Sequence, residues 1–146
     1  MSATSGIKSL NYLPHILARF AAKRFGFDEA ILTNTKGYIT EGTTSNIFIV
    51  KNNALITPSR ASGILPGITR GVIIEIAKKL KMNVKEKLVT RRELLYADEI
   101  FLTNSLAEVL PVTKVDSKRI ASGKVGDITK LLRIFYQKEV IREALQ

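Results

Sequence analysis

Two short apolar runs joined by a tight polar turn constrain the fold of this chain more than any other feature. Residues 47–50 and 54–57 flank Lys51-Asn52-Asn53. Because Asn tolerates the left-handed backbone geometry of tight hairpins, this stretch predicts a β-hairpin. A third run, residues 100–103, has the composition of a buried strand. The middle of the chain is therefore expected to form a sheet.

Three segments around these strands carry apolar residues at helical spacing. They run from residue 10 to a stop at Gly26, over residues 68–80 and over residues 126–145. In the last segment the residues expected to face inward are Leu131, Leu132, Phe135 and Ile141.

Shorter elements complete the pattern. Further strands are expected at residues 30–32, 38–40 and 84–89. Thr90 and Glu93 have the spacing of a capping box, which predicts a short helix over residues 91–97. Residues 58–67 contain two Pro and two Gly and predict a loop. Strands in the middle with helices outside them indicate one α+β domain spanning residues 1–146.

Length and composition exclude several classes of protein. With 146 residues, 45% of them apolar, the chain can build a sizeable core. The absence of Cys excludes a disulfide scaffold, and with a single His no metal site is expected. Neither a signal peptide nor a run of about 20 apolar residues is found, so we expect a soluble, cytoplasmic protein with no membrane partner.

The net charge of +10 raises the alternative of a nucleic-acid-binding module. The excess of Lys and Arg is spread along the chain, however. Its densest stretch consists of Lys78, Lys79, Lys81, Lys85 and Lys87. No aromatic residue lies among these lysines to stack on a base, so we interpret them as a solvated helix end and strand face.

Two polar junctions are candidate binding sites. The segment from Leu65 through Gly67 and Ile68 to Thr69 opens a predicted helix, where free N–H groups and the helix dipole suit a phosphate, although a simple helix cap explains it as well. The sequence Thr103-Asn104-Ser105 follows a buried strand and fits either a ligand site or a plain polar turn.

Three single residues are further candidates. Lys8 has apolar neighbours, which can lower the pKa of a lysine and favour a Schiff base. Glu41 ends a short strand, where a carboxylate is usually a surface group. His15 falls on the first predicted helix, and we interpret it as a partly exposed structural residue.

Taken in order along the chain, five motifs resemble the large C-terminal domain of the fold-type IV pyridoxal-phosphate enzymes. This family includes branched-chain aminotransferases, D-amino-acid aminotransferases and aminodeoxychorismate lyases. The motifs are Ile7-Lys8-Ser9-Leu10-Asn11-Tyr12-Leu13, residues 37–48, Leu65-Pro66-Gly67-Ile68-Thr69-Arg70, residues 97–101 and residues 103–112. The resemblance implies a mixed sheet or pseudo-barrel with flanking helices.

The resemblance also implies a cofactor, pyridoxal 5'-phosphate, and a role for each matching residue. Lys8 is expected to hold the cofactor as a Schiff base and to shuttle a proton. Glu41 matches the carboxylate that pairs with the pyridine nitrogen, and Tyr12 the residue that hydrogen-bonds the phenolate oxygen. The phosphate cradle is expected at Gly67, Ile68 and Thr69, with a second turn at Asn104 and Ser105 and with Leu65 packed on the ring.

Two reactions remain open on the resemblance. Tyr12 favours a branched-chain-like aminotransferase, which moves amino groups between amino acids and 2-keto acids through a Schiff base on Lys8. Asn104-Ser105 looks more like aminodeoxychorismate lyases, which release pyruvate and form 4-aminobenzoate.

The start of the sequence differs from the family pattern. Relatives carry a smaller N-terminal domain before the lysine segment, whereas only seven residues precede Lys8 here. We therefore expect a truncated chain, a split enzyme whose N-terminal half is a separate polypeptide, or a remnant retained without catalysis. A homodimer is also implied by the resemblance.

Overall fold

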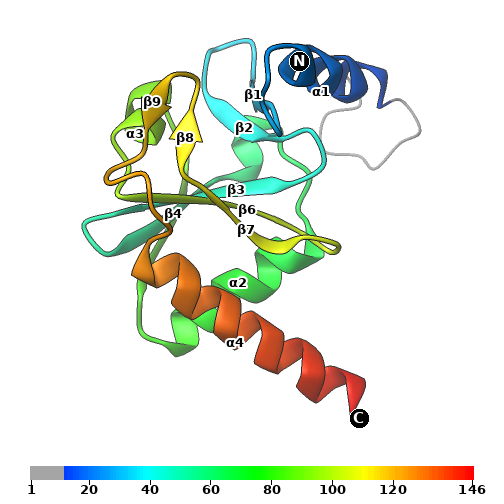
Figure 1. The fold of residues 1–146 in the computed structure, drawn as a ribbon. Coiled ribbons are helices and arrows are strands. Elements are labelled where there is room, and N and C mark those ends of the chain that lie inside the picture. The colour runs from blue at the N-terminus through cyan, green and yellow to red at the C-terminus, as the bar shows by residue number, and fades with distance from the viewer. Residues whose placement is uncertain (1–11) are drawn as a thin grey trace.

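The computed structural model describes residues 12–146, in which helices and strands follow one another in the expected order (Figure 1). The helices are α1 (Leu13–Arg24), α2 (Ile68–Lys79), α3 (Arg91–Leu95) and α4 (Asp127–Ala144), with a 3₁₀ turn, η1, at Arg60–Ser62. The strands are β1 (Ile31–Thr33), β2 (Ile39–Gly42), β3 (Asn46–Lys51), β4 (Ala54–Pro58), β5 (Asn83–Lys87), β6 (Glu99–Asn104), β7 (Glu108–Val112), β8 (Lys114–Val115) and β9 (Lys118–Arg119). The expected α+β class is confirmed.

Within residues 12–146 the strands form a mixed five-stranded sheet and two small two-stranded sheets. The large sheet has the order β5-β4-β3-β6-β7, and the small ones pair β1 with β2 and β8 with β9. The predicted hairpin is β3–β4, and its turn residues Asn52 and Asn53 have φ values of 49° and 61°. Only β4 and β5 pair in parallel in this sheet, because α2 crosses between them.

Alternating side chains of β3 supply two hydrophobic cores on opposite faces of the large sheet. Ile47 and Ile49 point into a core that the small sheets and α3 cover. Phe48 and Val50 point into a second core beneath α2 and α4. Figure 1 shows α2 and α4 together on one side of the sheet, with β1, β2, β8, β9 and α3 on the other. The sheet is therefore buried on both faces, as its apolar runs predict.

The start of α3 agrees with the prediction, whereas the buried face of α4 differs from it in part. The predicted capping box of Thr90 and Glu93 is present and starts α3. In α4, Leu132 is fully buried, but the expected inward positions Leu131 and Ile141 are 41% and 59% exposed, so that part of the prediction was wrong. The face of α4 that meets the core follows Thr129, Leu132 and Tyr136 instead because these positions share one side of a helix.

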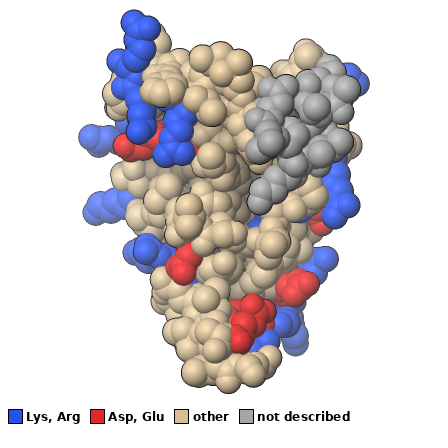
Figure 2. All heavy atoms as spheres, turned by 90° about the vertical axis from the view of Figure 1, so that its right-hand side faces the viewer, with Lys and Arg blue, Asp and Glu red and all other residues tan. Residues whose placement is uncertain are grey.

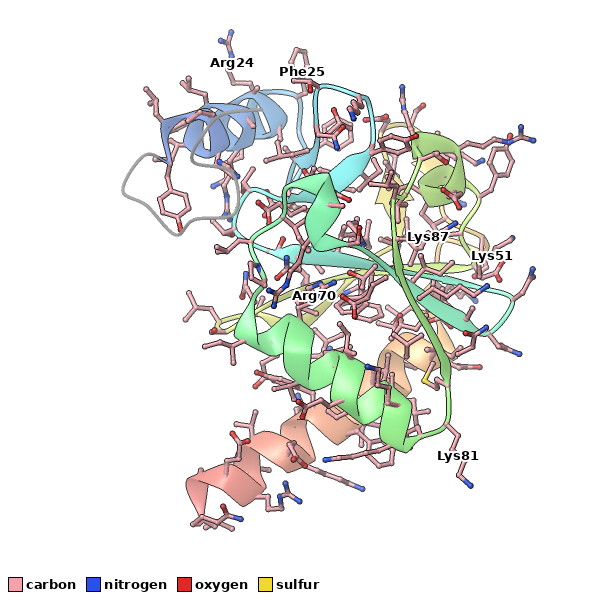
Figure 3. The ribbon with its side chains drawn as sticks, turned by 180° about the vertical axis from the view of Figure 1, so that it is seen from behind. Arg24, Phe25, Lys51, Arg70, Lys81 and Lys87 are labelled. Carbon is pink, nitrogen blue, oxygen red and sulfur yellow. The ribbon has the colours of Figure 1, made fainter. Side chains whose placement is uncertain are left out.

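Helix α1 is confirmed, yet none of its residues is buried. Its large apolar side chains are exposed at Leu13, Ile16, Leu17 and Phe20. Figure 3 shows Arg24 and Phe25 at the far end of this helix, pointing away from the rest of the fold.

The surface charge agrees with the scattered pattern in the sequence. On the face drawn in Figure 2, Lys and Arg lie in separate groups along the margins rather than in a continuous band. Within the described part of the chain one basic residue is internal. Arg70, labelled near the start of α2 in Figure 3, donates to the Pro58 carbonyl at 3.0 Å and to Glu86 at 2.8 Å. Among residues 12–146 no helix is both long and apolar enough to cross a bilayer.

Candidate functional site

Asn46, the first residue of β3, joins the sheet to the loop before α2. Its Nδ2 donates to the Leu65 carbonyl at 2.8 Å, and its Oδ1 accepts from the Gly67 N–H at 3.2 Å. The side chain is buried. A Cβ added to Gly67 would lie only 2.3 Å from Asn46 Oδ1, so this close approach requires Gly. The strand end and the helix start are thereby held together.

The start of α2 has the features of an anion site. Gly67 is the N-cap, and no side chain of the described residues caps the helix. The first N–H groups of a helix have no intrahelical partner, and the dipole there favours negative charge. Ile68 is 83% exposed, so the start of the helix is open to solvent and to a ligand. Thr69 is buried, with Oγ1 3.4 Å from the Tyr136 hydroxyl.

The second polar junction lies beside the first. Thr103 on β6 is the register partner of Asn46. The next residue, Asn104, donates to the Thr44 carbonyl at 3.3 Å and accepts the N–H of Leu106 at 3.0 Å, which forms the turn that presents Ser105. Both predicted junctions therefore lie at the same end of the sheet, which spacing along the chain could not show.

Two buried hydroxyl groups at this end have no hydrogen-bond partner in the described part of the chain. They are Ser45 Oγ and Thr103 Oγ1. A buried hydroxyl without a partner is destabilising unless a ligand or water completes it. The free N–H groups at the start of α2 remain the donors suited to a phosphate.

Glu41 on β2 faces the same loop. Its Oε2 accepts the Leu65 N–H at 3.0 Å. Burial raises the pKa of the Glu41 carboxyl above its ordinary value, whereas the Leu65 N–H and His15 act in the opposite direction. A partly desolvated carboxylate in this position can pair strongly with a protonated nitrogen base.

Helix α1 approaches Glu41 from another side through His15. Tyr12 packs edge-on against His15, with ring centroids 5.9 Å apart. His15 Nε2 lies 3.7 Å from Glu41 Oε1. Lys8 lies outside the described residues.

Contacts thus connect most of the residues singled out from the sequence. Tyr12 reaches Glu41 through His15, Glu41 reaches Leu65, and Asn46 links that loop to the Asn104 turn. Sequence reasoning missed two residues of this network. Asn46 was only one position in a longer motif, and His15 was interpreted as structural, although a polar residue within an apolar helix was a usable signal.

Sequence comparison finds relatives in one family of proteins. A sequence profile described as "Amino-transferase class IV" matches residues 1–115. A probable branched-chain-amino-acid aminotransferase of Aquifex aeolicus is 48% identical over 126 residues, covering 86% of this chain and 40% of that protein. A D-alanine aminotransferase of Bacillus licheniformis is 40% identical over 137 residues, covering 94% of this chain and 48% of that protein.

The fold is similar as well. The branched-chain amino acid aminotransferase of Thermobaculum terrenum, solved in its PLP form, superposes with a TM-score of 0.91 at 39% identity, covering 95% of this chain and 46% of that one. The chain therefore spans less than half the length of each of these relatives.

Proposed function

The chain belongs to the class IV aminotransferase family, and from this premise we propose that it is the pyridoxal-phosphate-binding part of a branched-chain-type aminotransferase. Its substrates would be amino acids and 2-keto acids. The observation that carries the proposal is the convergence at one sheet end of the partly buried Glu41 carboxylate, the start of α2 and the turn at Asn104.

Each part of this end suits one part of the cofactor. When bound, pyridoxal phosphate supplies a ring that accepts electrons from the substrate carbon. The N–H groups of Ile68 and Thr69 and the turn at Asn104 and Ser105 would hold the phosphate. Leu65, half-buried beside Glu41, would pack on the ring.

The remaining residues would hold or transfer protons. The Glu41 carboxylate would keep a proton on the pyridine nitrogen, which makes the ring a better electron acceptor. The Tyr12 hydroxyl would donate to the phenolate oxygen. The Lys8 amine would bind the cofactor and move a proton to and from the substrate carbon. This assignment of Lys8 is supported by the motif that places it four residues before Tyr12.

A covalent-labelling experiment tests the proposal. Addition of pyridoxal phosphate to the purified chain is expected to produce visible absorption, and borohydride followed by peptide mapping should place the label on Lys8. Lys8→Ala should abolish the label, whereas Lys36→Ala, in an exposed turn, should retain it. A label on another residue, or no label, would contradict the assignment.

The reaction is tested separately. Transamination should form 2-keto acids from branched-chain amino acids, whereas a lyase would release 4-aminobenzoate from aminodeoxychorismate. The aminotransferase names of the relatives support the first reaction.

Homodimer formation is part of the same proposal. The exposed apolar side chains of Leu13, Leu17 and Phe20 on α1 support burial of this helix against further protein surface. Sedimentation analysis should therefore give a mass of two chains, and a monomer at all concentrations would contradict this part.

A further inference from the structure

We propose that His15 is a positioning residue for Glu41, holding its carboxylate ionised and oriented and fixing α1 against β2. This inference rests on the proposed function, in which the Glu41 carboxylate pairs with the pyridine nitrogen of the cofactor. It concerns a residue that the family motifs quoted above do not assign.

The two carboxylate oxygens of Glu41 have different neighbours. Oε2 accepts the Leu65 N–H at 3.0 Å, which anchors one side of the group. Oε1 faces His15 Nε2 at 3.7 Å. This separation exceeds a hydrogen bond, so His15 acts on Oε1 mainly through the electrostatic attraction of its ring N–H or its positive charge.

The attraction of His15 opposes the effect of burial on the Glu41 carboxyl. The Glu41 side chain is 15% exposed, and desolvation favours its neutral form. A neutral carboxyl could not pair with a protonated pyridine nitrogen. The Leu65 N–H and His15 both oppose this effect of burial on the Glu41 pKa.

The other charged groups around this contact are directed elsewhere. Arg19, one turn after His15, lies 3.4 Å from Thr44 Oγ1. Glu29, in the connection between α1 and β1, accepts hydrogen bonds from Thr43. Within residues 12–146, His15 is thus the ionisable side chain at ion-pair distance from Glu41.

The contact also connects two parts of the proposed site. Helix α1 buries none of its residues, so few contacts determine its place. His15 is half-buried, touches Tyr12 on one side and faces Glu41 on the other. Its Nδ1 is buried without a hydrogen-bond partner among the described residues. His15 therefore sets the Tyr12 end of the site relative to the carboxylate.

A titration of the chain without cofactor tests this role directly. The Glu41 side-chain carboxyl would be followed by ¹³C NMR in the wild type, in His15→Ala and in His15→Gln, which fills similar space without the imidazole ring. Both variants are expected to move the Glu41 midpoint to higher pH. Arg19→Gln, on the same helix, is the matched control and should leave it unchanged. An unchanged midpoint in the His15 variants, or an equal shift in Arg19→Gln, would overturn the proposal.

A second measurement relates the contact to the cofactor. Both His15 variants should bind pyridoxal phosphate about 2- to 10-fold more weakly than the wild type, which is the range of one hydrogen-bond-sized interaction. Wild-type affinity in both variants would refute the positioning role even if the midpoint moves. If the wild-type chain binds no pyridoxal phosphate, the proposed function fails, and the titration still decides whether His15 controls Glu41.

Discussion

Replacing Asn46 with Ala is expected to destabilise the whole fold and to loosen the proposed cofactor-binding end. The side chain is 6% exposed and makes two hydrogen bonds, to the Leu65 carbonyl and from the Gly67 N–H. Each such bond contributes about 1 kcal/mol, and a buried partner left unpaired adds to the loss. We therefore expect the free energy of unfolding to fall by about 2–3 kcal/mol, which lowers Tm by about 6–12 °C in a chain of this size.

Urea unfolding of Asn46→Ala measures this loss, and Asn83→Ala is the matched control because Asn83 is exposed at the start of β5. The control should differ from the wild type by less than about 0.5 kcal/mol. The affinity for pyridoxal phosphate should fall only in the Asn46 variant. If the two variants are equally stable, the role given to Asn46 is refuted.

The close approach of Gly67 gives an independent check of the same contact. Gly67→Ala would place a Cβ 2.3 Å from Asn46 Oδ1, which forces the amide away. The substitution should therefore be much less harmful in Asn46→Ala than in the wild type. Additive effects of the two substitutions would show that the contact does not determine stability.

Three further predictions concern single elements. Because burial raises the folded-state pKa of Glu41 above its ordinary 4.5, ionisation opposes folding, so Glu41→Gln should be more stable than the wild type at pH 7. In urea unfolding this advantage should shrink as the pH falls through the raised pKa and be gone below 4.5. Thr90→Ala removes a capping box and should lower the free energy of unfolding by about 1 kcal/mol. A loss of less than a few tenths of a kcal/mol would argue against that cap. Leu132→Ala should lower it by about 2–5 kcal/mol and Leu131→Ala by much less, which thermal melts can compare; equal losses would refute the face assigned to α4.

Local chemistry made much of the fold predictable from the sequence. The hairpin β3–β4 follows from two apolar runs around Asn52 and Asn53, which adopt the expected positive φ. The start of α3 follows from the Thr90 and Glu93 spacing. These elements depend on residues a few positions apart, so no distant contact was needed to predict them.

Helix faces were less predictable, because periodicity shows that a helix has an apolar side but not what covers it. In α4 the exposed Leu131 and the buried Leu132 are neighbours of the same type, and contact with α2 and β7 selects between them. In α1 the apolar side is exposed, although its spacing resembles that of a core helix.

By itself the sequence determined the class of fold and the family resemblance, and it indicated the residues proposed to hold the cofactor. The tertiary structure decided which of these residues lie together. The pairing of β3 with β6 places Asn104 beside Asn46, and the loop before α2 brings Leu65 to Glu41. The contact of His15 with Glu41 joins residues 26 positions apart, where α1 approaches β2. Such contacts depend on how whole elements pack, and local spacing along a chain carries no record of that packing.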